Sequence, residues 1–546
     1  MKRAIISILA MMAGIQAFCC TNFLIGKDAS ADGSTMLSYN MDNYGMFTRL
    51  KVIPGGDHAP GEMTQVWNYD DHIPMGYIPQ ATHTYRVVGF INEKQLSIVE
   101  STFVGRKGQE NPDGLLHYTC LMELALQRAS TAREAIKVMT ELVAEYGYAS
   151  SGESFSIADP EEVWILEMIG KGADEKGAVW VAIRIPDDCI CAHANQSRIH
   201  RFDMKDKKNV MYSKDVVSYA RRKGFFSGKD SEFDFADAYC PADFHTQRAC
   251  DARAWSFFNM FVDGMERYLD FVDGMHVGAS EVMPLYFRPN RKITLREIMD
   301  GMRDHYDGTP FDMNVDCTGG AWESPYRPRP QEWEIDGKTY FHERPIATQQ
   351  SACTMVCQMR GDMPDDVGGV LWFGNDDAHM VTYTPVYCSS LRAPACYNDQ
   401  TASDVDFSWD SAFWVCNWVS NMAYQRYSKM YPDVRKVREE LQDRYVLGQA
   451  DVERKALAMT DDAARAEYLT AYGEECGAEM LSRWKELGIF LVVKYNDMAT
   501  KPEVDGRFLT TEEGRGVAPL REGYPDGYRR VIAEMTGDRY LSPSTP

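Results

Sequence analysis

Several motifs that identify common classes of hydrolase are missing from this chain of 546 residues. The G-x-S-x-G turn of serine hydrolases is absent, and so is the zinc-protease motif H-E-x-x-H, because His342-Glu343 is followed by Arg344-Pro345. No cysteines have the C-x-x-C spacing, and neither Cys189-x-Cys191 nor Cys353-x3-Cys357 has partners at zinc spacing. We therefore expect no metal and no cofactor, with these cysteines buried as small apolar residues.

Positive charge is also scarce. The chain has 58 Lys and Arg against 80 Asp and Glu, a formal net charge of −22. A chain this acidic has no general attraction for nucleic acid or anionic lipid. Beyond residue 20, no segment provides the roughly 20 apolar residues that a membrane-spanning helix needs. Internal repeats are missing too, whereas 45% hydrophobic and 25% charged residues are ordinary globular values.

The first 19 residues have the three parts of a secretory signal peptide. Lys2 and Arg3 form a basic start, residues 4–14 are apolar, and Ala17 and Cys19 occupy the −3 and −1 places of a cut before Cys20. A membrane anchor is the alternative, but the apolar run is shorter than the roughly 20 residues required. We expect export to the periplasm or the extracellular space. Either signal peptidase alone or an additional autocatalytic trimming would leave Cys20 as the first residue.

Hydrophobic patterns predict an α+β fold. Residues 54–79, rich in Pro and Gly, are predicted to be a loop, with Trp67–Tyr77 available to roof a pocket. Two helices are expected between residues 116 and 146, the second with a capping box formed by Thr131 and Glu134. The predicted strands are 21–27, 35–41, 86–91, 96–101, 154–158, 163–168, 178–185, 190–194, 354–359, 369–373 and 380–386.

The order of these elements predicts four parts of the chain. A signal peptide at 1–19 precedes a hydrolase core at 20–400, whose late strands return to the first sheet. Residues 401–500 are predicted to be a helical segment packed on the core, because no Pro/Gly/Ser linker separates it. Residues 501–546 are predicted to be a coil-rich tail.

A cysteine at a mature N-terminus combines two chemical functions. Its thiol has a pKa of about 8.5 and is a good nucleophile once deprotonated. Its own α-amine titrates at about 7.7 to 8.0, so the amine accepts the thiol proton and later returns it to a leaving amine. A disulfide partner or a lipidation site is the alternative for a cysteine that follows a signal peptide.

The segments that follow Cys20 resemble a known family. CTNFLIGK at 20–27 is similar to the start of the cysteine dipeptidases of the dipeptidase A family, in the N-terminal-nucleophile hydrolase superfamily. These enzymes are distant relatives of penicillin V acylase and bile salt hydrolase. Further similar segments are YNMDNY at 39–44, INEKQL at 91–96, AHANQSRI at 192–199, DHYDGTPFD at 304–312 and CQMRGDMPDDVGGVLWFG at 357–374. The resemblance extends to about residue 390 and implies a four-layer αββα core and hydrolysis of dipeptides or short peptides.

The resemblance also implies roles for individual residues. Cys20 corresponds to the nucleophile, and Asp42 to the acid that orients the nucleophile and its amine. Asn92 corresponds to the side-chain donor of the oxyanion hole, and Asn195 to a second Asn near the site. Arg253, in CDARAWSFF, is the weakest of these matches. An ordinary turn for Asp42 and Asn92, and a surface position for Arg253, are the alternatives.

One departure from the family concerns Tyr39, which stands where relatives carry Arg. A phenol cannot make the charged, bidentate contact of a guanidinium, so either another cation substitutes or the site is tuned differently. Gln95 also replaces an expected Gly. Two alternatives to a dipeptidase therefore stay open, an N-acyl amide hydrolase and a binding protein that has lost activity. A papain-like enzyme with an internal Cys and a distant His is a third.

Overall fold

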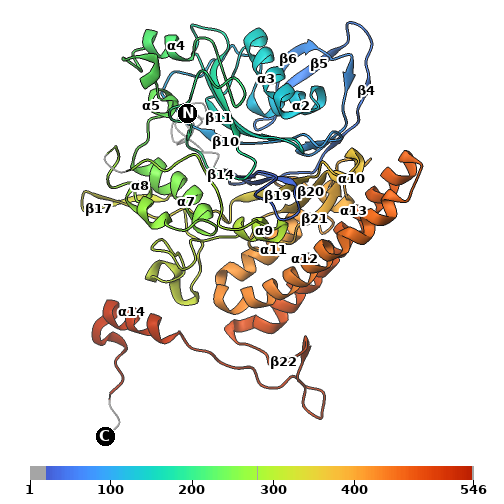
Figure 1. Ribbon diagram of the computed structural model, residues 1–546. Helices are drawn as coiled ribbons and strands as arrows, with labels where there is room; N and C mark the ends of the chain where they lie inside the picture. The colour runs from blue at the N-terminus through green and yellow to red at the C-terminus, as the bar shows by residue number, and fades with distance from the viewer. Residues whose placement is uncertain (1–19, 279–280, 544–546) are drawn as a thin grey trace, which may run out of the picture.

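The computed structural model describes residues 20–278 and 281–543 (Figure 1). The predicted signal peptide at 1–19 lies outside the described residues. Two large antiparallel sheets and the helices that pack on them make up most of the chain, which confirms the α+β class. The division into parts at residues 400 and 500 stays a prediction.

The seven-stranded sheet contains the beginning of the described chain at its centre. Its order is β16-β14-β1-β2-β19-β20-β21, so late strands do return to the first hairpin, as predicted. The hairpin forms because Asp32 accepts hydrogen bonds from Ser30 and Ser34 in the connecting turn. The strands are β1 (Thr21–Ile25), β2 (Thr35–Asp42), β14 (Ile190–His193), β16 (Tyr286–Phe287), β19 (Ser351–Met359), β20 (Val370–Asn375) and β21 (Thr384–Tyr387).

The eight-stranded sheet has the order β15-β13-β12-β11-β10-β9-β8-β3. Its strands are β3 (Val52–Ile53), β8 (Val87–Val88), β9 (Ile91–Asn92), β10 (Ser97–Phe103), β11 (Gly152–Ala158), β12 (Val163–Gly170), β13 (Ala178–Ile185) and β15 (Val210–Tyr212). Helices α2 (Tyr118–Arg128) and α3 (Ala132–Tyr146) pack on it. The Thr131 half of the predicted capping box is confirmed, because Thr131 Oγ1 accepts a hydrogen bond from the Glu134 amide, while the Glu134 carboxylate accepts hydrogen bonds from Ser130. Helix α3 ends at Gly147, as predicted.

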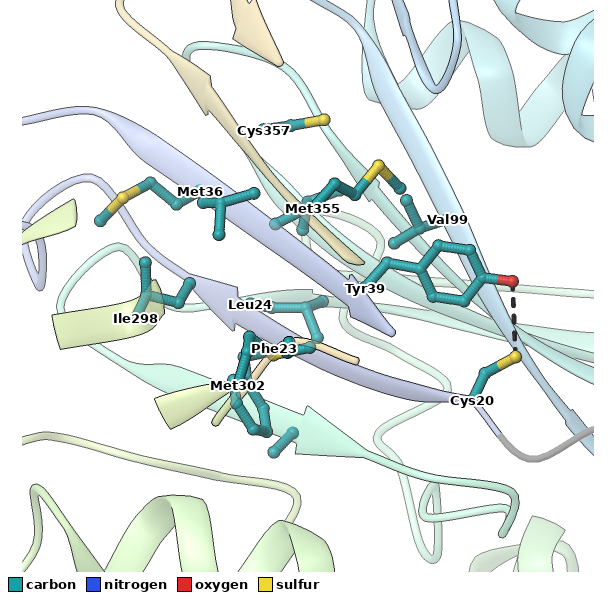
Figure 2. Close-up of a cluster of buried hydrophobic side chains, with 14 of the residues drawn as sticks. Cys20, Phe23, Leu24, Met36, Tyr39, Val99, Ile298, Met302, Met355 and Cys357 are labelled. Carbon is teal, nitrogen blue, oxygen red and sulfur yellow. Dashed lines mark hydrogen bonds between the residues drawn. The ribbon is translucent and has the colours of Figure 1, made fainter. Parts of the chain in front are cut away.

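The two sheets contact each other through β1, β2 and β10. Apolar side chains of both sheets, among them Leu24, Tyr39 and Val99, belong to one buried cluster (Figure 2). On its other side the seven-stranded sheet is covered by α7 (Ala252–Asn259) and α9 (Leu295–Gly301). Smaller helices are α4 (Val216–Arg222), α5 (Phe235–Tyr239), α6 (Phe244–Thr246), α8 (Leu269–Val272) and α10 (Asp365–Gly368).

The predicted helical region consists of α11 (Ala412–Gln425), α12 (Tyr427–Leu457) and α13 (Asp462–Tyr495). Helices α12 and α13 contact β21, so they extend the body of the protein at the edge of the seven-stranded sheet. None of the described helices combines the length and the apolar character that crossing a bilayer requires.

Two stretches predicted to be irregular contain regular structure. Within 54–79 lie β5 (Met63–Asn68) and β6 (Ile73–Pro79), a separate two-stranded hairpin that tolerates its prolines because it joins neither large sheet. Short strands β4 (Gly56–Asp57) and β7 (His83–Thr84) pair beside it. The predicted coil-rich tail contains β22 (Glu503–Val504), β23 (Arg507–Phe508) and the exposed helix α14 (Asp526–Thr536). Outside both stretches, β17 (Glu332–Ile335) and β18 (Lys338–Phe341) form a further two-stranded hairpin.

Candidate active site

Strand ends of the seven-stranded sheet bring the predicted site residues together. Strand β1 is antiparallel to both β14 and β2, and β2 is antiparallel to β19. The start of each strand therefore lies beside the end of its neighbour. Cys20 precedes β1, Asp42 ends β2, Asn195 follows β14 and Ser351 begins β19. Residues remote in sequence thus meet at a single edge of the sheet.

The thiol of Cys20 is directed into the protein and is 2% exposed. Its Sγ lies 3.4 Å from the hydroxyl of Tyr39 and 3.5 Å from Oε1 of Glu100. Figure 2 shows the Tyr39 hydroxyl pointing at the thiol from the neighbouring strand. Burial, and then the charges of Glu100 and Asp42, raise the pKa of the thiol well above its ordinary value. At neutral pH Cys20 is therefore protonated and needs a base before it can attack.

The backbone carbonyl of Cys20 is held by a network that includes two of the predicted residues. Arg253 donates from one terminal nitrogen to this carbonyl at 2.8 Å and to Thr21 Oγ1 at 2.7 Å, and from the other to Asn195 Oδ1 at 2.9 Å. Ser101 Oγ donates to the same carbonyl at 3.2 Å and accepts from the Asn195 amide at 2.7 Å. Arg253 is fully buried, so the surface alternative is wrong.

Asn195 reaches this network through an unusual backbone conformation. Its φ of 52° lies in the left-handed region, which Asn adopts more readily than most residues. Its side-chain amide donates to the carbonyl of Thr102 at 2.7 Å, on β10 of the other sheet. Asn195 therefore joins the two sheets next to Cys20.

Asp42 lines the same cavity as Cys20 and is fully enclosed. Its carboxylate accepts a hydrogen bond from Arg344 at 2.6 Å and another from Ser351 Oγ at 2.6 Å. Burial raises the pKa of Asp42 to about 6 even though Arg344 opposes the shift. Arg344 was not predicted, because no motif near it in the chain indicates a contact with residue 42.

Asn92 lies apart from Cys20. Its amide nitrogen donates to the carbonyls of Leu126 and Ala129, and its oxygen accepts from the amides of Lys94 and Leu96. These four bonds use the full capacity of the side chain and fasten the turn after β9 to the end of α2. Asn92 does not line the cavity that contains Cys20. Its oxyanion role stays a prediction that this geometry does not favour.

Two acidic residues were not predicted from the sequence: Glu100, which contacts Cys20, and Glu153, which lies on the neighbouring strand. Glu100 accepts a short hydrogen bond from the Tyr39 hydroxyl, and Glu153 accepts one from Thr102 Oγ1 at 2.6 Å. Glu100 lies on β10 and Glu153 on the neighbouring β11, and both side chains are buried. Glu100 is the only charged residue of the segment 96–103, and this was a signal, because burying a carboxyl group without a function is costly.

The cavity at Cys20 has a volume of about 650 Å3. This lies within the range of small-molecule sites, about 300–1,000 Å3, and suits a short peptide. The segment from Trp67 to Tyr77 was predicted to roof a pocket. Tyr69 of this segment lines the cavity, whereas Trp67 does not line it. Other lining residues are Tyr39, Asp70, Glu100, Tyr118 and Phe373.

The residues best placed to bind a metal ion lie away from Cys20. Among residues 20–278 and 281–543, one group offers three close ligand atoms, from His200, Asp234 and Asp237. His200 forms an ion pair with Asp234 at 3.0 Å, and although burial opposes it, this contact raises the pKa of His200. A protonated imidazole is a poor ligand, so the group is better described as an ion pair. This group lines a different cavity from Cys20.

Comparison with known proteins gives the family. A probable dipeptidase of Salmonella dublin is 26% identical over 410 residues, which cover 71% of this chain and 85% of the relative. A dipeptidase of Bifidobacterium longum is 25% identical over 426 residues, 71% of this chain and 75% of the relative. Dipeptidase A of Lactobacillus helveticus is 24% identical over 448 residues, 77% of this chain and 85% of the relative.

The family comparison agrees with these relatives. The sequence model of Peptidase family C69 matches residues 19–440, a range that includes Cys20, both large sheets and the start of the helical segment. The resemblance to cysteine dipeptidases is thereby confirmed. Because this match extends over far more than half of the chain, the protein belongs to peptidase family C69.

Proposed function

We propose that the protein is a dipeptidase in which Cys20 is the N-terminal nucleophile and its own α-amine is the general base. The observation that carries the proposal is the setting of Cys20. Its thiol opens into a cavity of peptide size, while its carbonyl is fixed by Arg253 and Ser101. The names of the relatives, which are dipeptidases or probable dipeptidases, support peptides as substrates.

The chemistry requires cleavage of the bond before Cys20. While residue 19 is attached, the nitrogen of Cys20 is an amide and cannot accept a proton near neutral pH. Once it is an amine, it takes the thiol proton as sulfur attacks the scissile carbonyl carbon. The same proton then passes to the leaving amine as the peptide bond breaks. Water, deprotonated by the α-amine, hydrolyses the resulting thioester and restores the thiol.

The surroundings of the thiol support an amine base over a histidine base. No histidine among the described residues hydrogen-bonds the Cys20 thiol, whose contacts are Tyr39 and Glu100. His193, on the adjacent strand, is hydrogen-bonded to Ser156 at 2.7 Å, and burial lowers its pKa to about 3. The papain-like alternative is therefore disfavoured.

Three further features belong to the proposal. The core adopts the four-layer αββα arrangement of N-terminal-nucleophile hydrolases. Residues 1–19 direct the chain to the periplasm or the extracellular space. Hydrolysis needs no metal, because thiol and amine supply the nucleophile and the base.

The sharpest test moves the amine and leaves every side chain in place. Two proteins are prepared with a cleavable leader, one that leaves Cys20 first and one that leaves a single Ala before Cys20. The amine of the extended protein lies about 3.8 Å further along the chain. We expect dipeptide hydrolysis to fall by about 10² to 10⁴ or more, the usual value of general-base catalysis. Mass spectrometry confirms the two N-termini, and circular dichroism confirms that both are folded.

Two controls complete the test. The protein that begins at Cys20 should lose activity after alkylation with iodoacetamide and keep it in a strong chelator. An extended protein that stays untrimmed and keeps near-full activity would place the base elsewhere. Faster cleavage of N-acylated amino acids than of dipeptides would move the protein to the acylase branch of the superfamily.

A further inference from the structure

The cavity wall beside Cys20 carries acidic groups that lack cationic partners. Glu100 is 1% exposed and Glu153 is fully buried, yet neither forms an ion pair with any Lys or Arg in the part of the chain that the structure describes. Asp70 accepts a hydrogen bond from Tyr118 at 2.7 Å and lies 4.0 Å from His117. Burial lowers the pKa of His117 to about 4, so this imidazole is neutral at pH 7.

Glu100 and Glu153 project from the same face of neighbouring strands, because Thr102, two residues after Glu100, is paired with Glu153, and their carboxyl groups interact electrostatically. Oε2 of each is buried and has no hydrogen-bond partner within residues 20–278 and 281–543. Two such groups in contact cannot both be ionised, so they share one proton. Burial raises the pKa of both, and the charge of Glu100 raises that of Glu153 further. The pKa of Glu153 is raised the more strongly, and Glu100, whose Oε1 lies 3.5 Å from Sγ, is the carboxyl group that faces the nucleophile.

The distance between this carboxylate and the thiol matches the dimensions of a peptide end. Within the first residue of a peptide, the amine nitrogen and the scissile carbonyl carbon are about 2.5 Å apart. A sulfur poised for attack lies roughly 3 to 3.5 Å from that carbon. The amine is thus held a few ångströms from Sγ, and Glu100 Oε1 lies 3.5 Å from Sγ. The ammonium group of the substrate can therefore form a hydrogen bond of about 2.8 Å with the Glu100 carboxylate.

We propose that Glu100, positioned by Tyr39 and Glu153, binds the α-ammonium group of the substrate's first residue and so selects peptides with a free amino end. This inference rests on the proposed function, since it assumes that Cys20 is the nucleophile. It also gives a role to Tyr39, the residue that replaces the family's Arg. A guanidinium at this position would pair with Glu100 and occupy the place of the substrate's amine, whereas the phenol orients the carboxylate and leaves its charge available.

Substrate binding then has a second effect. The charge of Glu100 helps to keep the Cys20 thiol protonated. An ammonium group bound to Glu100 neutralises that charge and lowers the pKa of the thiol. Peptides with a free amino end therefore activate the nucleophile as well as fill the cavity.

Binding to an inactive enzyme tests the proposal without depending on hydrolysis. The Cys20→Ala protein, prepared with a leader that leaves residue 20 first, is titrated by calorimetry with alanyl-alanine and with propanoyl-alanine, which lacks only the amine. We expect the dipeptide to bind about 10- to 100-fold more tightly, as a charged hydrogen bond predicts. Adding Glu100→Gln should abolish this preference. Glu123→Gln should keep it, although Glu123 is also a carboxyl group of the cavity.

Kinetics of the active enzyme separate this inference from the proposed function. In Glu100→Gln, kcat/KM should fall for alanyl-alanine and change little for propanoyl-alanine. An equal fall for both substrates would overturn the proposal and assign Glu100 to the amine of Cys20 itself. A preference for the dipeptide that survives Glu100→Gln, or is absent from the Cys20→Ala protein, would overturn it too. If tight, Glu100-dependent binding is found but no peptide is cleaved, the proposed function fails and the ammonium site stands.

Discussion

Replacing Arg344 by Met is the most informative test of the ion pair that holds Asp42. Both side chains are buried, and the Arg344 guanidinium lies 2.6 Å from the Asp42 carboxylate. Removing one partner of a buried pair costs about 3–5 kcal/mol, because the remaining charge has lost its compensation. Ser351→Ala is the matched control, since it removes only a hydroxyl donor to the same carboxylate and should cost about 1 kcal/mol.

The free energy of unfolding that Arg344→Met loses should depend on pH, because it depends on the pKa of Asp42. That pKa is about 6 in the folded protein, above the value of about 3.9 expected in the unfolded chain. The folded state binds the proton more tightly, so the contribution of Asp42 to stability is full below pH 4 and is lost as the pH rises through 6. Without Arg344 the folded pKa of Asp42 moves higher. The difference in free energy of unfolding between the unmodified protein and Arg344→Met should therefore grow between pH 6 and pH 8 and be smaller at pH 5.

Urea unfolding at pH 5, 6.5 and 8 measures these free energies, and a double-mutant cycle with Asp42→Asn isolates the pair. Asp42→Asn leaves Arg344 buried without its carboxylate, whereas the double variant removes both charges. We expect a coupling energy of about 2–3 kcal/mol at pH 8. Additive losses, or a cost of Arg344→Met that does not change with pH, would refute this account of the site.

Two further predictions concern stability outside the site. Thr131→Ala removes the N-cap of α3, whose hydroxyl accepts a hydrogen bond from the Glu134 amide at 3.3 Å. It should lower the free energy of unfolding, measured by urea titration, by about 1 kcal/mol, and Thr131→Ser should restore this stability. Gly488→Ala should destabilise the contact of α11 with α13 by about 1–3 kcal/mol, because an added Cβ would lie 2.1 Å from the Trp418 ring. A gain of about 1 kcal/mol, as helix propensity alone predicts, would show that the ring moves aside freely.

Local patterns in the sequence predicted the elements that form from neighbouring residues. The hairpin of β1 and β2 and the capped helix α3 occur where they were expected, and the segment 401–500, predicted to be helical, contains α11, α12 and α13. The hairpin at 63–79 was missed because Pro and Gly usually mark loops, and a small two-stranded hairpin is a permitted exception.

Only the site residues that belong to a recognisable sequence motif could be predicted. Cys20 was selected from its place after the predicted signal peptide, and Asp42 from its similarity to a family motif. The same reasoning selected Asn92, which uses its amide in a local turn. Glu100 and Arg344 come into contact with the site through tertiary packing of distant strands and loops, and no spacing in the sequence records such contacts.

The wide spacing of the site residues along the chain links activity to the completion of folding. The contact of Arg253 with Cys20 joins positions 233 residues apart, and that of Arg344 with Asp42 joins positions 302 apart. Contacts of such long range require the closure of large loops and form slowly. A chain that is still folding has its cysteine and its carboxylates but not the arrangement that makes them a peptidase. The site is thus complete only once both sheets have paired, so hydrolytic activity would report that this chain has finished folding.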